Sequence, residues 1–207
     1  MNGLFIVLEG PDGSGKTTQI RLLQQYLQGQ GRECVVTREP GGTQIGEAIR
    51  QVILNPAYKE MSDVTEMLLY AASRAQLVHD VIAPALDAGK VVISDRFVDS
   101  SIVYQGIARG LGQDTVSMVN APAIAACRPD MVLFIDIPEE EGIARKKEQK
   151  KLDRMEQESI DFHHKVSEGF RQLLKDREDV ICLDGLASVE EIHAQILKQI
   201  NQRLDQR

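Results

Sequence analysis

The chain has 207 residues, of which 43% are hydrophobic and 27% are charged, and its formal net charge is −7. These values fit one α/β domain over residues 1–207, and they exclude a disordered or membrane-spanning chain. The negative charge disfavours nucleic acid and anionic membranes as partners, so a phosphate-bearing ligand must be held by local groups.

Short apolar runs rich in β-branched residues alternate along the chain with longer segments of helical periodicity. This pattern predicts parallel βαβ units. The predicted strands are residues 4–8, 34–37, 91–94, 131–135 and 180–183, and the predicted helices are residues 15–28, 44–54, 64–88, 97–108, 115–126, 138–147, 158–175 and 189–204. Because the strands lack alternating polar residues, we expect a five-stranded parallel sheet that helices bury on both faces. Ligands should bind at the carboxyl ends of its strands.

The three cysteines, Cys34, Cys127 and Cys182, are far apart and have no metal-binding spacing. We expect them to be buried, reduced thiols, as in proteins of the cytoplasm. The first apolar run leads directly into a glycine-rich loop and does not match a signal peptide. The sequence therefore predicts a cytoplasmic protein.

Residues 10–17 follow the first predicted strand and read GPDGSGKT, which satisfies the GxxxxGK(S/T) pattern of a phosphate-binding loop. Glycines let backbone N–H groups converge on phosphate oxygens, and the helix that follows adds its positive end. Lys16 is expected to reach the β- and γ-phosphates, and the Thr17 hydroxyl is expected to bind Mg²⁺. The predicted ATP-binding residues are Gly10, Pro11, Asp12, Gly13, Ser14, Gly15, Lys16, Thr17 and Thr18.

The third predicted strand ends in an acidic–basic pair, Asp95 and Arg96. An Asp at this place can hold the water shell of Mg²⁺, and an Arg can bind a phosphate through two parallel hydrogen bonds. Asp136, after the fourth strand, is a competing metal ligand, but the proline two residues later favours a helix entry and cap there. We therefore predict Thr17 and Asp95 as metal ligands, and Lys16, Asp95 and Arg96 as catalytic residues.

Residues 38–42 (REPGG) follow the second predicted strand. Pro40 keeps Glu39 out of the helical region, and the two glycines permit an unusual turn. Two alternatives remain open for Glu39, namely a structural ion pair with Arg38 or a position near the metal.

Two predicted helices carry aromatic and polar residues on one face. Tyr70 and Arg74 are spaced i, i+4, and Ser101, Tyr104 and Gln105 are spaced i, i+3, i+4. An aromatic ring offers a surface for stacking, whereas a guanidinium and a carboxamide can recognise the edge of a base. The combination suits a pyrimidine.

Together these segments resemble the bacterial thymidylate kinases over nearly the whole chain. The resemblance is carried by residues 9–18 (EGPDGSGKTT), 38–42 (REPGG), 69–74 (LYAASR), 95–101 (DRFVDSS), 104–106 (YQG) and 152–159 (LDRMEQES). It implies a P-loop NTPase fold and the transfer of the γ-phosphoryl group of ATP to thymidine monophosphate (dTMP) with Mg²⁺. It also implies a homodimer formed through long helices such as residues 64–88, with its Ala71-Ala72 surface.

The resemblance also implies roles for single residues. Arg74 would read the thymine edge, Tyr70 would stack near the ring, and Ser101 and Gln105 would complete the base contacts. The sugar and phosphate contacts would be Tyr104 against the 2′ position, Asp12 at the 3′-hydroxyl, and Arg96 on the acceptor phosphate with Arg38 and Arg50 near it. Glu39 completes the predicted acceptor site.

Residues 142–155 contain the basic run RKKEQKKLDR, where the family has a lid over ATP. No basic residue occurs at positions 11–14, so the resemblance puts the catalytic cation in the lid. We expect Arg145 in this role, with Lys147 as the second candidate, although this lid has more lysine than the arginine-rich lids of the family. Arg154 is expected to pair with Asp153 or Glu156 and to fix the hinge. Lid closure would neutralise developing charge and exclude water.

Two alternatives compete with this interpretation. The chain could phosphorylate another nucleoside or deoxynucleoside monophosphate, or it could be a nucleotide-binding regulatory ATPase. A second anion site and a basic lid argue against the ATPase, because a regulatory switch has no need of a phosphate acceptor.

Overall fold

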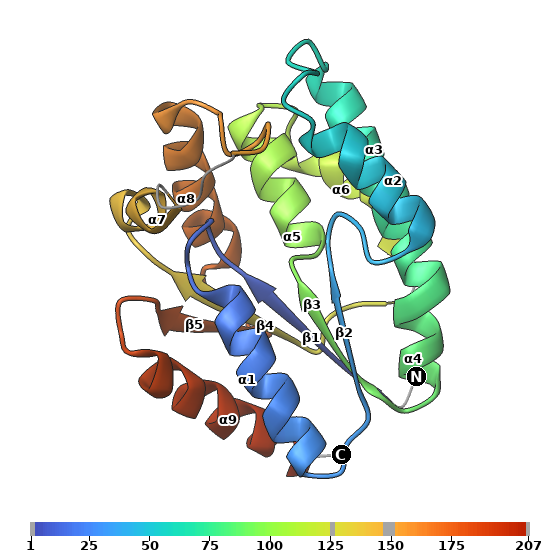
Figure 1. The fold of residues 1–207 in the computed structure, drawn as a ribbon, viewed down its shortest axis with the longest axis vertical. Helices are drawn as coiled ribbons and strands as arrows, with labels where there is room; N and C mark the ends of the chain where they lie inside the picture. The colour runs from blue at the N-terminus through green and yellow to red at the C-terminus, as the bar shows by residue number, and fades with distance from the viewer. Residues whose placement is uncertain (1–2, 125–126, 147–151, 206–207) are drawn as a thin grey trace.

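The computed structural model describes residues 3–124, 127–146 and 152–205, and within them five parallel strands form one sheet (Figure 1). The strands are β1 (Leu4–Glu9), β2 (Cys34–Arg38), β3 (Val91–Asp95), β4 (Met131–Asp136) and β5 (Val180–Asp184), in the order β2-β3-β1-β4-β5. The predicted α/β architecture is confirmed. Each strand runs one residue beyond its predicted end, to a charged side chain.

Helices begin where the sequence predicts them to within two residues. They are α1 (Lys16–Gly29), α2 (Gln44–Leu54), α3 (Asp63–Leu77), α4 (Ala83–Asp87), α5 (Val98–Ser101), α6 (Gln113–Ile124), α7 (Glu139–Lys146), α8 (Ile160–Leu174) and α9 (Val189–Asp205). Side-chain caps fix several starts: the hydroxyls of Thr43, Ser62 and Ser159 accept hydrogen bonds from backbone N–H groups of α2, α3 and α8.

Two predicted helices have a different internal geometry. The predicted helix over residues 64–88 consists of α3, a π-helical segment (η1, Val78–Ile82) and α4. The predicted helix over residues 97–108 consists of α5 and a π-helical segment (η2, Ile102–Ala108). Apolar periodicity cannot distinguish these wider turns, because they shift the helix face by only one residue.

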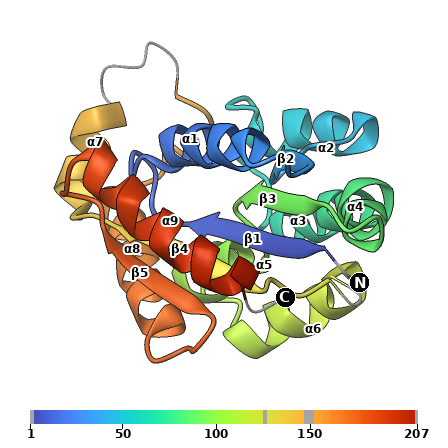
Figure 2. The same cartoon turned by 90° about the horizontal axis from the view of Figure 1, so that it is seen from below.

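Helices cover the two faces of the sheet with separate apolar clusters (Figure 2). On one face, Leu4, Ile6 and Leu8 of β1 pack against apolar side chains of α1 and α9. On the other face, Phe5 and Val7 pack against α3, η1 and α4, while β4 contributes to a cluster with η2 and α8. Alternate residues of β1 thus face opposite layers, as a doubly covered strand requires.

The expectation that all strands are buried on both faces is wrong for the outer pair. β2 and β5 are the edges of the sheet, and their exposed or half-buried residues include Val36 and Cys182. The expectation of three buried thiols fails for the same reason: Cys127 is buried, Cys34 in β2 is half-buried and Cys182 in β5 is exposed. None of the three forms a disulfide. Edge position depends on strand order, which the apolar pattern does not encode.

The register of β1, β2 and β3 brings the polar carboxyl ends of these strands together. Leu8 of β1 and Arg38 of β2 both align with Asp95 of β3. The loop after β1 then turns into α1 through Gly15, whose φ of 93° lies in the left-handed region that favours glycine. In the described residues, no helix is long and apolar enough to cross a membrane.

Candidate active site

Lys16, in the first turn of α1, is folded back onto the phosphate loop. Its Nζ donates hydrogen bonds to the carbonyl oxygens of Gly10 (3.0 Å) and Pro11 (2.9 Å) and to Ser14 Oγ (3.3 Å). The side chain is buried. Burial, assisted by the positive charge of Arg96, lowers the pKa of Lys16 to about 8. The positive charge of Lys16 is therefore incompletely balanced by its surroundings. An anion bound in the loop would stabilise the charged form of the amine.

Thr17 and Asp95 lie together at the start of α1 and the end of β3. The Thr17 hydroxyl is 3.5 Å from Asp95 Oδ2. These are hard oxygen donors of the kind that Mg²⁺ prefers, and two protein groups suffice because Mg²⁺ keeps several waters and phosphate ligands. The described residues hold no cluster of three or more metal-ligating side chains. The competing candidate, Asp136, binds the guanidinium of Arg171 through both carboxylate oxygens.

Arg96 is held in a strained backbone conformation directly after β3, with a φ of 71°. Its guanidinium donates to Asp12 Oδ1 (2.8 Å) and to Ser100 Oγ (3.1 Å), and it lies over the ring of Tyr104 at 5.3 Å from the centroid. These contacts hold the guanidinium beside the phosphate loop. The Arg96 side chain remains 15% exposed. A guanidinium that is fixed in orientation and partly exposed is suited to binding an anion.

Glu9, the last residue of β1, supports this turn and was not predicted as a site residue. The buried carboxylate accepts hydrogen bonds from the N–H groups of Phe97 (2.9 Å) and Ser100 (3.2 Å) and from Ser100 Oγ (2.6 Å). Burial and the nearby charge of Asp99 raise its pKa to about 7. The sequence does contain a feature that could have predicted this role, because Glu9 is the one charged residue at the end of an otherwise apolar strand.

One of the two alternatives expected for Glu39 is excluded by its ion-pair partner. Arg38 pairs with Glu47 (2.8 Å), so the predicted Arg38–Glu39 ion pair is wrong. Glu39 instead forms a buried ion pair with Arg74 of α3. Arg38 is the last residue of β2 and Glu39 follows the strand, and their side chains have different partners, Glu47 of α2 and Arg74 of α3.

Every N–H group of Arg74 has a partner. Nε donates to Glu39 (2.8 Å), Nη1 donates to Ser101 Oγ (3.0 Å) and to Asn120 Oδ1, and Nη2 donates to Glu39 and to the Phe97 carbonyl (3.1 Å). The side chain is 1% exposed. Contact with a ligand would therefore require Arg74 to share or exchange one of these bonds.

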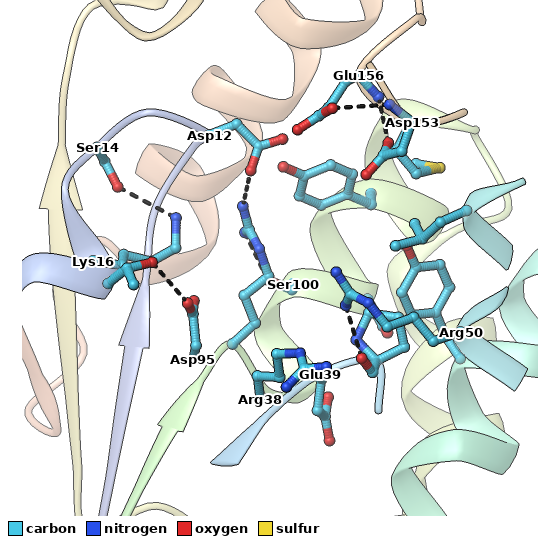
Figure 3. A pocket seen from close by; sticks show the side chains of 18 of the residues that line it. Asp12, Ser14, Lys16, Arg38, Glu39, Arg50, Asp95, Ser100, Asp153 and Glu156 are labelled. Carbon is cyan, nitrogen blue, oxygen red and sulfur yellow. Dashed lines mark hydrogen bonds and ion pairs between the residues drawn. The ribbon is translucent and has the colours of Figure 1, made fainter. Parts of the chain in front are cut away.

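One cavity of about 480 Å³ is lined by Lys16, Thr17, Arg74, Asp95 and Arg96, among other residues (Figure 3). Figure 3 shows Lys16 and Asp95 on one side of it and Arg50 and Asp153 on the other. The volume lies in the range of small-molecule sites. The predicted residues that line it are Asp12, Gly13, Ser14, Gly15, Lys16, Thr17, Thr18, Arg38, Glu39, Arg50, Tyr70, Arg74, Asp95, Arg96, Ser101, Tyr104 and Gln105.

The predicted residues outside this lining are Gly10, Pro11 and Arg145. Gly10 and Pro11 turn their carbonyls to Lys16, and a Cβ at Gly10 would come within 2.5 Å of the Ile135 carbonyl. Arg50 Nη1 donates to the Pro40 carbonyl (2.8 Å), which holds its guanidinium beside the cavity. The geometry thus joins a donor-phosphate loop, a second cationic position and a pocket lined by tyrosines.

Comparison with known proteins assigns the family. A family model described as "Thymidylate kinase" matches residues 8–196. The chain belongs to the thymidylate kinase family. It is 49% identical over 205 residues to a thymidylate kinase of Caldanaerobacter subterraneus subsp. tengcongensis, covering 99% of this chain and 98% of the relative.

Two further relatives agree. A thymidylate kinase of Kosmotoga olearia is 45% identical over 197 residues, covering 95% of this chain and 94% of the relative. A thymidylate kinase of Geobacillus sp. (strain WCH70) is 43% identical over 210 residues, covering each chain fully. The thymidylate kinase resemblance expected from the motifs is confirmed.

The predicted lid of this family member lies partly outside the described residues, and Lys147 is among those not described. Arg145 of α7 donates to Glu141 Oε1 (2.9 Å) and to the Gly13 carbonyl (3.3 Å), so it reaches the phosphate loop. The backbones of the loop and α7 are close, since a Cβ at Gly13 would meet the Gly142 carbonyl at 2.6 Å.

The predicted partner of Arg154 is wrong. Arg154 is buried, and it donates to Glu66 Oε2 of α3 (2.6 Å) and to the Ile53 carbonyl (2.7 Å). Asp153 and Glu156 exchange backbone–carboxylate hydrogen bonds with each other. The C-terminal end of the lid segment is therefore anchored to α2 and α3. The sequence did not single out Glu66 as a partner, because its only visible feature was its place in an amphipathic helix.

Proposed function

We propose that this member of the thymidylate kinase family transfers the γ-phosphoryl group of ATP to the 5′-phosphate of dTMP. The observation that carries the proposal is a single cavity that holds Lys16 and Thr17 at one end and Arg96 and Arg74 further along. A nucleotide-binding switch needs the first end only. Two anion-binding positions within one cavity suit transfer between two phosphates.

At the donor end, the residues of the loop would bind the phosphates of ATP. Lys16 would exchange its hydrogen bonds to the loop carbonyls for phosphate oxygens, which restores a full positive charge to the amine. Thr17 and Asp95 would hold Mg²⁺, whose charge offsets that of the donor phosphates. Arg145, beside the Gly13 carbonyl, would approach the transferred group when the lid closes.

At the acceptor end, Arg96 would bind the 5′-phosphate. Its present partners are Asp12 and Ser100, which hold the fork in place without fully burying it. An acceptor oxygen aligned with the γ-phosphorus forms the new P–O bond while the bond to the bridging oxygen of ADP breaks. The residues therefore act by positioning and by neutralising charge, and no strong base is required.

Further along the cavity, the base would lie among Tyr70, Arg74, Ser101 and Gln105. Tyr70 and Tyr104 offer ring surfaces, and burial raises the pKa of both hydroxyls, so each stays a neutral donor. Arg74 would reach the base edge only by sharing a hydrogen bond now made to Ser101 or Asn120. Arg38 and Arg50, which line the cavity, would flank the acceptor phosphate, and Asp12 would contact the sugar.

ADP production from Mg·ATP, measured with each common ribo- and deoxynucleoside monophosphate in turn, tests the proposal. We expect strong turnover with dTMP and little with purine or cytosine monophosphates. Preference for a different monophosphate would retain the kinase and overturn the thymine assignment. ADP release that is independent of any acceptor would overturn the transfer reaction in favour of a regulatory ATPase.

We also propose that the chain acts as one domain with a lid over residues 142–155, and that it forms a homodimer in the cytoplasm. Ala71 is buried, which corrects the expected Ala71-Ala72 surface. The exposed stripe of α3 instead contains Val64 and Leu68, with relative exposures of 50% and 51%, followed by Ala72. Such a stripe on a long helix supports pairing of two copies. Substituting Leu68 by Asp and measuring the mass in solution tests it.

A further inference from the structure

Glu66 is a fully buried carboxylate in α3 that connects the base end of the cavity with the anchor of the lid. Its Oε1 accepts hydrogen bonds from Gln105 Nε2 (3.0 Å) and Arg109 Nε (3.2 Å). Its Oε2 accepts from Arg109 Nη2 (3.0 Å) and Arg154 Nη2 (2.6 Å). Two guanidinium groups thus hold the carboxylate in a fixed orientation, and Gln105 is its one neutral partner among the residues described.

The charge of Glu66 determines which way the Gln105 amide faces. Although burial opposes ionisation, hydrogen bonds from Arg109, Gln105 and Arg154 hold the pKa of Glu66 below its ordinary value. An ionised carboxylate only accepts hydrogen bonds. The NH₂ group of Gln105 must therefore face Glu66, because a flipped amide would place two oxygens against each other.

The consequence lies at the other end of the amide. Gln105 lines the cavity and is 1% exposed, and within the described part of the chain its Oε1 has no hydrogen-bond partner. A buried carbonyl oxygen without a partner costs free energy that a ligand donor can recover. Nearby, Ser101 Oγ accepts from Arg74 and keeps its own hydrogen to donate. The pair presents one acceptor and one donor to the cavity.

We propose that Glu66 is a positioning residue that fixes the Gln105 carbonyl as a hydrogen-bond acceptor and thereby selects a pyrimidine that carries a hydrogen on N3. The inference rests on the proposed function. Thymine and uracil carry N3–H beside the O4 acceptor and match an acceptor next to a donor. Cytosine offers an acceptor at N3 and a donor at N4, so it would place two acceptors together at Gln105. A site built on paired polar groups rejects such a mismatch strongly.

The decisive variant is Glu66→Gln. Its amide oxygen would accept from Arg154 and Arg109 at the Oε2 position, which turns its NH₂ toward Gln105. Gln105 would then flip and present its own NH₂ to the cavity. We expect the ratio of kcat/KM for dTMP to that for deoxycytidine monophosphate to fall by about 10- to 100-fold. The ratio for dTMP against deoxyuridine monophosphate should not change, since both bases carry N3–H.

The cluster supplies a matched control in Glu158→Gln. Glu158 accepts from the same Arg109 Nη2 (2.6 Å), whereas the amide of Gln105 donates to Glu66, so loss of the Glu158 charge weakens the cluster without reversing the amide. This variant should keep the wild-type base ratio. The double variant Glu66→Gln/Gln105→Glu restores an oxygen toward the cavity and keeps the charge of the cluster. It should recover most of the thymine preference.

Binding of the two deoxynucleotides in the absence of ATP, measured by calorimetry, should reproduce the change in ratio. Equal losses for the thymine and cytosine nucleotides in Glu66→Gln, with no recovery in the double variant, would overturn the inference and leave Glu66 a purely structural residue. In that case the proposed function would still hold, provided that the wild-type protein phosphorylates dTMP. A wild-type preference for the cytosine nucleotide would overturn both.

Discussion

The two ends of the cavity are built in different ways. At the donor end, the residues proposed to bind phosphate form one continuous segment, residues 10–18, and the hydrogen bonds of Lys16 to described residues all go to carbonyl and hydroxyl oxygens of its own loop. At the acceptor end, side chains from the segment after β2, from α5 and from α6 converge on Arg74 of α3, which pairs with Glu39 in a buried network. A local motif can be complete in sequence, whereas a converging network depends on the fold. Four substitutions test this difference.

The largest effect is expected for Lys16→Met. Loss of the amine removes charge neutralisation at the transferred group, so kcat should fall by roughly 10³-fold. Because the pKa of Lys16 is lowered to about 8, its charge destabilises the unliganded fold below that pH. Thermal unfolding of the variant at pH 7 should therefore occur at or above the wild-type temperature. A large loss of stability would show that the donor end is also a structural network.

Arg74→Ala should instead reduce stability. It leaves Glu39 buried without its partner, and the free energy of unfolding should fall by about 3 kcal/mol. Urea unfolding measures this, and the double variant Glu39→Gln/Arg74→Met, which removes both charges, should recover part of the loss. A single variant as stable as wild type, with altered base selectivity only, would contradict the description of the acceptor end as a prebuilt network.

Arg96→Lys keeps the charge but removes the planar fork. Lysine cannot form two parallel hydrogen bonds with a phosphate, so kcat/KM for the monophosphate should fall by about 10²-fold. The KM for ATP should change little, because the loop is intact. Steady-state kinetics with each substrate varied in turn measures the effect on the monophosphate separately from the effect on ATP. Equal increases in both KM values would argue against an acceptor-specific role.

The smallest effect concerns Glu9, which holds the segment after β3 through Phe97 and Ser100. Its pKa is raised to about 7 from an ordinary value of 4.5, mainly by burial. The folded state therefore binds this proton more tightly, and the associated stability is present below pH 4.5 and is lost as the pH rises through 7. Glu9→Gln should gain about 1–2 kcal/mol relative to wild type between pH 5 and pH 8 in urea unfolding. A pH-independent difference would contradict this.

The sequence predicted the elements well because their apolar patterns are local. All five predicted strands are present in the described residues, and the phosphate loop was complete in its motif. Features that depend on strand order or helix facing were missed, such as the exposure of Cys182 and the pairing of Arg154 with Glu66. Most of the motif residues do line one cavity, but some of their ion-pair partners lie far away in the chain, such as Glu39 for Arg74 and Asp12 for Arg96. Spacing along a helix cannot identify a partner on another element.

The close approach of Gly13 and Gly142 limits how this chain can vary. Gly13 occupies one of the positions that the phosphate-loop pattern leaves open to any residue, and Gly142 belongs to no motif. Yet a Cβ on Gly13 would meet the Gly142 carbonyl at 2.6 Å, and a Cβ on Gly142 would meet the Asp12 carbonyl at 2.6 Å. The two positions therefore share one steric constraint, although they lie in distant parts of the sequence. The absence of two methyl groups keeps the donor loop and the start of the lid in direct backbone contact.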